Sequence, residues 1–274
     1  MTEKRVILIT GASSGIGFDT ARKLAAQGHT VYGAARRIEL MEPLREHGVI
    51  PLSMDVTDES SMVSAVDSII AAQGHIDVLV NNAGYGYLGA IETVPLEEAR
   101  RQLEVNLFGL ARLTQLVLPH MRAQHCGRII NISSIAGKAV ILFGGWYNVS
   151  KFSVEAFSDA LRMEVREFGI KVSIIEPSGI RTAWGTIAAD NLEQASTGTA
   201  YQERGLKMAR IFRWAYTSKL LSGPERVSAA IVRAANARRP RLRYRPGMGA
   251  CTILFFRAIL PSRWWDAIVK SLLS

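Results

Sequence analysis

The segment "RVILITGASSGIG" at residues 5–17 joins an apolar run to a glycine-rich turn and to the start of a helical pattern. The run "VILI" has the continuously apolar, β-branched character of a buried strand. In the turn, Gly11 permits a tight bend, Gly15 lets a pyrophosphate approach the backbone, and Gly17 lets the helix pack closely on the sheet. The segment predicts a dinucleotide-binding strand–turn–helix. A glycine-rich turn without a ligand is the alternative when the motif is taken alone.

Five further apolar segments follow along the chain, namely "TVYGAA", "VIPLSMDV", "DVLVNN", "GRIINIS" and "KVSIIEP". Helical patterns between them predict helices over residues 18–26, 58–73, 96–122 and 147–168, the second with Asp58 as its N-cap. Continuously apolar strands that alternate with helices are typical of a doubly wound parallel sheet covered on both faces. Residues 184–222 are polar and weakly periodic, which favours a mobile lid over a linker.

The composition limits the class of protein. A chain of 274 residues with 48% hydrophobic content suits one α/β domain or two small ones. Cys126 and Cys251 are too few and too isolated for a disulfide framework or a metal site, which indicates a reducing compartment. A strand pattern begins at Val6 and no apolar run reaches about 18 residues, so we expect neither a signal peptide nor a membrane span. The sequence predicts a cytoplasmic protein without a metal.

The positive charge is concentrated near the C-terminus. Residues 238–274 hold eight Lys or Arg and one acid, a net charge of +7, so residues 1–237 contribute +2 of the total +9. This basic segment could face an anionic membrane, an acidic partner or solvent. Nucleic acid is disfavoured as a partner, because the aromatic residues there stand within apolar stretches and not between the arginines.

Seven motifs between residues 10 and 182 stand in the order found in one known family: "TGASSGIG", "MDVTD", "NNAG", "VNLFGL", "NISS", "YNVSK" and "EPSGIRT". The sequence resembles the classical short-chain dehydrogenase/reductase family, and it is similar to the branch of 17β-hydroxysteroid and retinol dehydrogenases. The resemblance implies a single Rossmann-type domain with six or seven parallel strands and helices on both faces. It also implies a nicotinamide cofactor, alcohol–ketone interconversion by a Ser, Tyr, Lys and Asn tetrad, and a homo-oligomer, either a dimer or a tetramer.

The end of the second strand predicts which nicotinamide cofactor binds. An acidic residue there would hydrogen-bond the ribose hydroxyls of NAD, but the chain has Ala35, followed by Arg36 and Arg37. A guanidinium can bind the 2′-phosphate of NADP with two parallel hydrogen bonds, so NADP(H) is favoured over NAD(H). The alternative is that both arginines merely begin a solvated helix. Together with the resemblance, this gives the expected cofactor-binding residues: Gly11, Ser13, Ser14, Gly15, Ile16, Gly17, Arg36, Arg37, Asp55, Val56, Asn82, Ala83, Gly84, Tyr147, Lys151, Pro177, Gly179, Ile180 and Thr182.

Tyr147 and Lys151 stand four residues apart at the start of a helical pattern, so both can face the cofactor. A cation about 4 Å from a phenolate, at an effective dielectric of about 20, is worth roughly 4 kcal/mol. We therefore expect Lys151 to lower the pKa of Tyr147 towards a value useful in acid–base catalysis. The resemblance implies that Lys151 also holds the nicotinamide ribose. It further implies that Ser134, thirteen residues before Tyr147, contacts the substrate oxygen and that Asn106 anchors a water in the proton relay.

The chain departs from the family pattern after the sixth strand. Pro177 is followed by Ser178, where the family usually has glycine, and only then by Gly179. A positive φ at residue 178 would strain a serine by about 1 kcal/mol or more. The departure puts the contact to the nicotinamide carboxamide in question, whereas the family's threonine is retained as Thr182.

Aromatic residues near these motifs are candidates for the substrate wall and suggest a bulky lipophilic alcohol or ketone. For each of them, packing in the core or at a subunit interface is the alternative. One alternative function is a reductase of carrier-bound 3-oxoacyl chains, for which the cluster at residues 238–245 would attract an acidic carrier. The other is a non-catalytic NADP sensor, against which the complete tetrad argues. The candidate residues are Tyr85, Tyr87, Phe143, Trp146 and Trp184.

Residues 1–249 form the expected catalytic domain, including the lid at 184–222, and residues 250–274 form an apolar helical tail. Helical spacing begins at Ile253, Pro261 breaks it, and Ser262 can cap a second helix. We expect the tail to cover the mouth of the active site or to make a subunit contact, ahead of attachment to a membrane surface. The second helix would carry Trp264, Trp265, Ile268 and Leu272.

Overall fold

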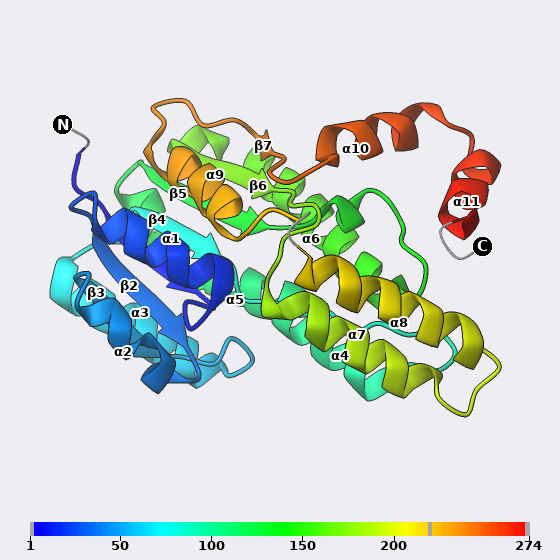
Figure 1. Cartoon of the computed structure of the whole chain (residues 1–274). Coiled ribbons are helices and arrows are strands. Elements are labelled where there is room, and N and C mark those ends of the chain that lie inside the picture. The colour runs from blue at the N-terminus through cyan, green and yellow to red at the C-terminus, as the bar shows by residue number, and fades with distance from the viewer. Residues whose placement is uncertain (1–2, 219–220, 272–274) are drawn as a thin grey trace.

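A parallel sheet of seven strands forms the centre of the protein in the part that the computed structural model describes, residues 3–218 and 221–271 (Figure 1). The strand order is β3-β2-β1-β4-β5-β6-β7, so the direction of winding reverses between β1 and β4. Ligands of doubly wound sheets bind beyond the carboxyl ends of the strands at such a reversal. The strands are β1 (Val6–Thr10), β2 (Thr30–Ala35), β3 (Val49–Ser53), β4 (Val78–Asn81), β5 (Gly127–Ile132), β6 (Ile170–Ile175) and β7 (Arg243–Tyr244).

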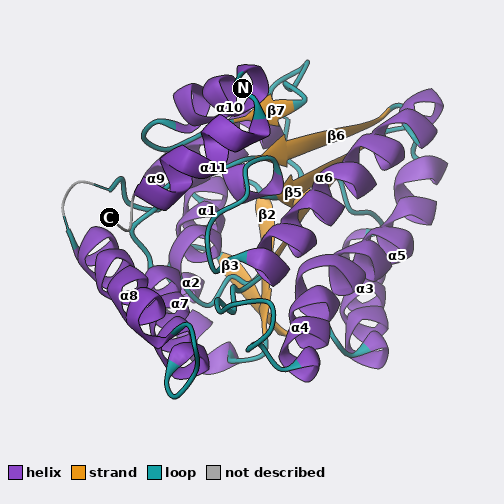
Figure 2. Cartoon of the chain, turned by 90° about the vertical axis from the view of Figure 1, so that its right-hand side faces the viewer, coloured by secondary structure: helices purple, strands orange, loops and turns teal. Residues whose placement is uncertain are grey.

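Helices cover both faces of this sheet, with α1, α2 and α9 on one side and α3, α5 and α6 on the other (Figure 2). The single Rossmann-type domain expected from the sequence is confirmed. Among the described residues the α-helices are α1 (Gly15–Ala25), α2 (Glu42–Arg45), α3 (Glu59–Gln73), α4 (Leu96–Leu103), α5 (Gly109–Ala123), α6 (Gly145–Glu164), α7 (Ala183–Ser196), α8 (Gln202–Thr217), α9 (Glu225–Asn236), α10 (Ala250–Ile259) and α11 (Ser262–Ser271).

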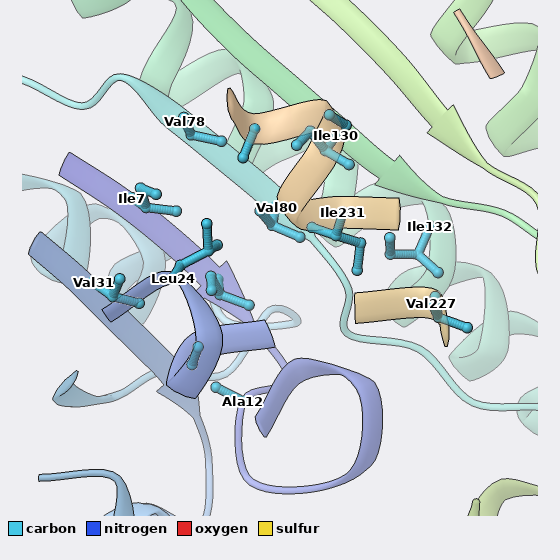
Figure 3. Close-up of a cluster of buried hydrophobic side chains, with 14 of the residues drawn as sticks. Ile7, Ala12, Leu24, Val31, Val78, Val80, Ile130, Ile132, Val227 and Ile231 are labelled. Carbon is cyan, nitrogen blue, oxygen red and sulfur yellow. The ribbon is translucent and has the colours of Figure 1, made fainter. Parts of the chain in front are cut away.

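The strands are apolar on both faces because each face packs against helices. In β1, Ile7 and Ile9 belong to the cluster that contacts α1 and α9, which Figure 3 shows around Leu24 and Ile231. Leu8, between them in the strand, points to the opposite cluster with α3, α5 and α6. Each such side chain, fully removed from water, contributes about 1.5–3 kcal/mol. The two hydrophobic cores, one on each face of the sheet, therefore hold the strands in place and position their carboxyl ends, where the site lies.

The six strands expected from the sequence are all present, and the N-cap of α3 is confirmed, because Asp58 accepts hydrogen bonds from the backbone of Ser60 and Ser61. The resemblance allowed for a seventh strand, but none of the apolar segments located it. It contains only two residues, Arg243 and Tyr244, and gives no alternating or apolar signal. Its pairing with β6 over Ile174 and Ile175 comes from tertiary packing.

Two regions differ from the simple sequence pattern. The helix expected over residues 96–122 is interrupted by a π-helix, Glu104–Phe108, which separates α4 from α5 around Asn106. The segment 184–222, expected as a mobile lid, contains two regular helices, α7 and α8. These pack closely at glycines, since a Cβ at Gly185 would collide with the ring of Tyr216. The helical periodicity is weak because many of the buried positions are occupied by Gly, Ala and Ser, with only a few large apolar residues such as Leu192 and Met208 among them.

The expected C-terminal tail forms the two short helices α10 and α11, with the break at Pro261. In Figure 1 they lie to one side of the layered body, beyond β7. Leu272, which the sequence pattern assigns to the second helix, lies outside the described residues. Within the described part of the chain, none of the helices has the length and apolar character needed to cross a bilayer.

Candidate active site

A cleft of about 840 Å³ lies at the carboxyl ends of the central strands. It runs from the turn after β1 and the end of β2, past β4 and β5, to the loop after β6 and the helices α7 and α8. Most of the residues expected to bind a cofactor line it. Gly17 does not, because it lies under the turn, where a Cβ would collide with the Gly11 carbonyl.

The glycine-rich turn has the geometry of a phosphate cradle. Gly11 and Gly15 have φ angles of 66° and 55°, in the left-handed region that favours glycine. Ser14 makes no side-chain cap at the start of α1, and the first turn of that helix holds no acidic residue. The first backbone N–H groups of α1, together with its dipole, are therefore suited to an anion such as a pyrophosphate.

Asn82 and Ala83, at the end of β4, hold this turn in place. The Asn82 side-chain amide donates hydrogen bonds to the carbonyls of Thr10 (2.9 Å) and Gly11 (3.2 Å). The backbone N–H groups of Asn82 and Ala83 donate to the Thr10 hydroxyl at 3.0 and 2.9 Å. The strand-four motif thus supports the cradle through its hydrogen bonds as well as lining the cleft.

The end of the cleft beside β2 is basic. Arg36 and Arg37 are exposed on its wall directly after β2, and within the described residues neither is engaged in an ion pair. Asp55 also lines the cleft, but one of its carboxylate oxygens accepts hydrogen bonds from the backbone and the hydroxyl of Thr57. That oxygen of Asp55 therefore serves a local turn, although the residue also lines the cleft.

Ser134, Tyr147 and Lys151 meet at the centre of the cleft. Tyr147 lies in the first turn of α6, and the Ser134 hydroxyl is close enough to its phenol to act on the pKa of that phenol in the lowering direction. Lys151, one turn later, donates from Nζ to the Ile132 carbonyl at 2.9 Å, and its Nζ lies 5.9 Å from the centre of the Tyr147 ring. The strand end at Ile132 and the helix α6 together fix these three side chains.

Burial has the largest effect on the pKa values of Tyr147 and Lys151. Desolvation raises the pKa of Tyr147 to about 12, although Ser134 partly offsets it. Desolvation likewise lowers the pKa of Lys151 to about 8, against the attraction of the Glu155 carboxylate. The lowering of the tyrosine pKa expected from Lys151 is not seen in this state of the site, where desolvation of the phenolate outweighs the effect of Ser134 and Lys151 is not among the groups that shift the tyrosine pKa.

Asn106 lies in the π-helix and is almost fully buried behind the cleft. Its side chain accepts from the Tyr85 N–H at 3.0 Å and donates to the Tyr85 carbonyl at 2.9 Å and to the Ser150 hydroxyl at 3.0 Å. It therefore fixes the loop after β4 to α6. The water-anchoring role implied by the resemblance stays a prediction.

The aromatic candidates for the substrate wall divide into two groups. Tyr85, Tyr87 and Trp184 line the cleft, and the Trp184 ring lies 5.1 Å from that of Tyr147. Phe143 and Trp146 are absent from the wall, and Phe143 packs edge-on against Tyr201 at 6.4 Å. The sequence analysis missed further wall residues. A search of α7 and α8 for apolar positions near Trp184 could have found Ile187, Phe212 and Tyr216, but no such signal marks Asn191, which is polar, or Ile141, which lies in the loop before α6.

The strain considered for Ser178 is absent, because the positive φ of this loop belongs to Gly179 (48°), and Ser178 is not among the residues of positive φ. The Ser178 hydroxyl instead donates to the Met248 carbonyl at 2.6 Å. Serine in place of the family's usual glycine thus links the loop after β6 to the segment that precedes α10.

The basic cluster at residues 238–245 is partly turned inward. The carboxylate of Glu176, fully buried, pairs with Arg243 at 2.9 Å and with Arg245 at 2.7 Å. Arg243 also pairs with Asp159, on α6, at 2.5 Å. These two arginines join β7 to the sheet and to α6, so they are not available to attract an acidic carrier protein.

The fold and the cleft define a nicotinamide-dependent oxidoreductase of the Rossmann type, and comparison with known proteins gives its family. The family model for short chain dehydrogenases matches residues 5–192, so the chain belongs to the short-chain dehydrogenase/reductase family. No cluster of His, Cys, Asp or Glu suited to a metal ion is found among the described residues.

Relatives of the chain carry oxidoreductase names. It is 36% identical over 263 residues to a probable short-chain type dehydrogenase/reductase, VdlC, of Helicobacter pylori, with 96% of each chain covered. It is 45% identical over 183 residues to a 3-ketodihydrosphingosine reductase of Bacteroides thetaiotaomicron, with 66% of each covered.

Solved structures share the fold over nearly the whole chain. A short-chain dehydrogenase from Streptomyces avermitilis matches with a TM-score of 0.81 and 30% identity, covering 98% of this chain and 95% of that one. A metagenomic short-chain oxidoreductase in complex with NADP matches with a TM-score of 0.70 and 26% identity, covering 88% and 97%. A Burkholderia phymatum enzyme in complex with NAD matches with a TM-score of 0.79 and 25% identity, covering 94% and 93%. Both nicotinamide cofactors therefore occur among the structural relatives.

Proposed function

We propose that this protein is an NADP(H)-dependent oxidoreductase that interconverts a lipophilic ketone and its secondary alcohol. The observation that carries the proposal is that one cleft contains a basic end, a group of catalytic type and an apolar wall. Two unpaired arginines stand at one end of it, the Ser134–Tyr147–Lys151 group at its centre, and an apolar aromatic wall at the other end. The residues present fit a bound dinucleotide, because the turn after β1 admits no Cβ at Gly11 or Gly17 without collision.

The preference for NADP(H) rests on charge. A 2′-phosphate carries negative charge that an acidic residue at the end of β2 would repel, and this chain has Ala35 there with Arg36 and Arg37 beyond it. Guanidinium groups form short, charge-assisted hydrogen bonds to phosphate. NAD(H) would leave both guanidinium groups without a partner.

The catalytic roles follow from the positions of the three side chains. The nicotinamide supplies or accepts the hydride when it is bound. A phenol with a pKa of about 12 is protonated at neutral pH, so Tyr147 can donate its proton to the oxygen of a ketone as that oxygen gains charge. The Ser134 hydroxyl orients the same oxygen, and the ammonium of Lys151, close to the ring, stabilises the phenolate that the transfer leaves.

The aromatic wall of the cleft indicates the class of substrate. Trp184, Phe212 and Tyr216 form adjacent aromatic contacts at 5.7 and 5.8 Å between ring centres, and all three line the cleft. Such a surface suits an extended apolar group better than a short polar one. A relative named as a 3-ketodihydrosphingosine reductase supports a ketone that carries a long aliphatic chain. The carrier-bound alternative loses support because Arg243 and Arg245 pair with Glu176.

The test is a set of ketones of graded size. NADPH consumption should be measured by absorbance with 3-ketodihydrosphingosine, with a bulky cyclic ketone and with acetone, and each assay should be repeated with NADH. We expect turnover of the long-chain or bulky ketones with NADPH and little with acetone. Turnover of acetone at an equal kcat/KM would contradict the proposed preference for lipophilic substrates. No turnover of any of these ketones would contradict the proposed reductase activity.

A further inference from the structure

The tail helices α10 and α11 present large apolar side chains to solvent. Trp264 is 65% exposed, Phe255 60% and Ile259 57%, and Phe256 and Ile268 are also exposed. Figure 1 shows α10 next to β7 and α11 beyond it, farther from the sheet and outside its helix layers. Large apolar side chains gathered and exposed on neighbouring helices in this way mark an interaction site.

The patch does not serve the cleft. The residues that line the cleft end at Pro224 in the described part of the chain, so α10 and α11 contribute none. The described residues of the tail therefore give no support to the expectation that it covers the active-site mouth. A subunit contact and a membrane surface are the remaining possibilities.

The positions of the charged residues on α11 distinguish between a subunit contact and a membrane surface. At 100° per residue, Trp264 and Ile268 lie on one side of the helix, whereas Arg263 and Lys270 lie on the opposite side with Asp266. Within the described residues none of these charged side chains forms an ion pair. An apolar face with tryptophan, backed by free basic residues, is the pattern of a helix that lies in the plane of an anionic membrane. Of these residues only Lys270 and Asp266 are of types depleted in protein interfaces, where Trp, Phe and Arg are enriched, so the placing of the charge opposite the apolar face carries the distinction.

The tail is also fixed firmly enough to act as one unit. Its start is held by the hydrogen bond from Ser178 to Met248 and by the burial of Ala250 and Leu254. The two helices contact each other where the Arg257 guanidinium lies 6.0 Å from the centre of the Trp265 ring. Each helix has 10 residues and extends about 15 Å, half the thickness of the hydrocarbon layer, so the pair suits the surface of a bilayer.

We propose that α10 and α11 dock the protein on the surface of an anionic membrane. Phe255, Ile259, Trp264 and Ile268 enter the boundary between headgroups and acyl chains, and Arg263 and Lys270 remain with the anionic headgroups. This interaction is separate from the catalytic chemistry and does not depend on which substrate the cleft binds.

The test uses flotation of the purified full-length protein with two kinds of vesicle: phosphatidylcholine mixed with phosphatidylglycerol, and phosphatidylcholine alone. We expect binding to the anionic vesicles and a shift of tryptophan fluorescence to shorter wavelength. Trp264→Gln with Ile268→Gln should abolish flotation. Ala267→Gln, on the polar side of the same helix, should retain it and serves as the matched control. Arg263→Gln with Lys270→Gln should weaken binding by about fivefold for each charge removed.

NADPH titration of each variant shows that its fold is intact, because none of the substituted residues lines the cleft. Failure of the wild-type protein to float with anionic vesicles would overturn the proposal, as would equal loss of flotation in Ala267→Gln. Size-exclusion chromatography gives the third outcome. If the Trp264 and Ile268 double variant dissociates an oligomer while the wild-type protein never floats, the face is a contact between two copies of this chain, and the membrane proposal is wrong.

Discussion

The hydroxyl of Ser178 donates a 2.6 Å hydrogen bond to the carbonyl of Met248, and the two residues are 70 positions apart in the chain. Ser178 belongs to the loop that lines the cleft after β6, and Met248 precedes the tail helices. A second bond, from the Ser178 N–H to the Pro246 carbonyl at 3.0 Å, fixes the same contact. The cofactor loop and the base of the tail are thus one structural unit.

Ser178→Ala should loosen this unit. The hydroxyl is buried, and a lost hydrogen bond costs about 1 kcal/mol of the free energy of unfolding. We expect a melting temperature lower by about 2 °C and faster proteolysis of residues 250–271. Ser173→Ala is the matched control, because its buried hydroxyl donates to the Arg241 carbonyl, away from the tail. Equal proteolysis of the tail in both variants would show that Ser178 does not hold it.

Arg36→Ala combined with Arg37→Ala should weaken NADPH binding and leave NADH binding unchanged. Hydrogen bonds to charged groups contribute about 1.5–3 kcal/mol each, so the Kd for NADPH should rise by at least about tenfold. Isothermal titration with both cofactors measures the two affinities. Arg45→Ala is the control, since that exposed arginine follows β2 but pairs with Glu42 outside the cleft. An unchanged NADPH affinity in the double variant would contradict the proposed 2′-phosphate site.

The sequence predicted those features of this site that depend on local chemistry. The tight glycine turn at Gly11 and the cap at Asp58 are properties of short segments, and the mainly apolar sequences of the central strands β1 and β4 indicate that these strands are buried. The positions of Tyr147 and Lys151 follow from helical spacing alone. Such features need no knowledge of the rest of the chain.

The features that the sequence did not predict depend on contacts between distant segments. The pKa of Tyr147 is raised because the surrounding chain buries it, and Trp184, one of its aromatic neighbours, comes from α7. Phe143 and Tyr216 are both aromatic residues near a motif or a lid, yet only Tyr216 lines the cleft. Arg243 belongs to a basic run but pairs with the buried Glu176. In each case the partner lies in another element, so no local pattern identifies it.

Tyr147→Phe should abolish turnover while the protein still folds and binds NADPH. The substitution removes the proton that the ketone oxygen receives and keeps the ring that packs on Trp184. Removal of a general acid costs about 10²–10⁴-fold in kcat. Tyr32→Phe is the control, because that buried tyrosine bonds to Gln73 on the far side of the sheet from α1 and α9. Retention of most of the wild-type kcat in Tyr147→Phe would place the proton donor elsewhere.

The rate of ketone reduction should fall as pH rises through about 8. Burial lowers the pKa of Lys151 to about 8, so above that pH the ammonium is lost and the phenolate formed by Tyr147 is no longer stabilised. The Glu155 carboxylate opposes this shift of the Lys151 pKa. Glu155→Gln should therefore move the fall of kcat/KM to lower pH.

The control for this profile is Asp159→Asn. Asp159 also pairs with Arg243, but it is not among the groups that shift the pKa of Lys151. Asp159→Asn should lower the free energy of unfolding without moving the pH profile of kcat/KM. A kcat/KM that is level from neutral to strongly alkaline pH would exclude Lys151 as the titrating group.

Trp184→Ala should raise KM for a long-chain ketone and change KM for a short ketone little. The indole packs against Gly86, where a Cβ would lie 2.5 Å from it, and it stands between the rings of Tyr147 and Tyr216, so it forms the start of the apolar wall. An aliphatic chain that loses this surface loses roughly 1.5 kcal/mol or more of binding free energy, or at least about tenfold in KM.

Trp184→Phe, which keeps an aromatic ring beside Tyr147, separates loss of the wall from loosening of the catalytic tyrosine. Trp214→Ala, on the solvent side of α8 with 63% of its surface exposed, is the matched control. If Trp184→Ala lowers kcat equally for short and long ketones with KM unchanged, Trp184 positions Tyr147, and the substrate chain lies elsewhere in the cleft.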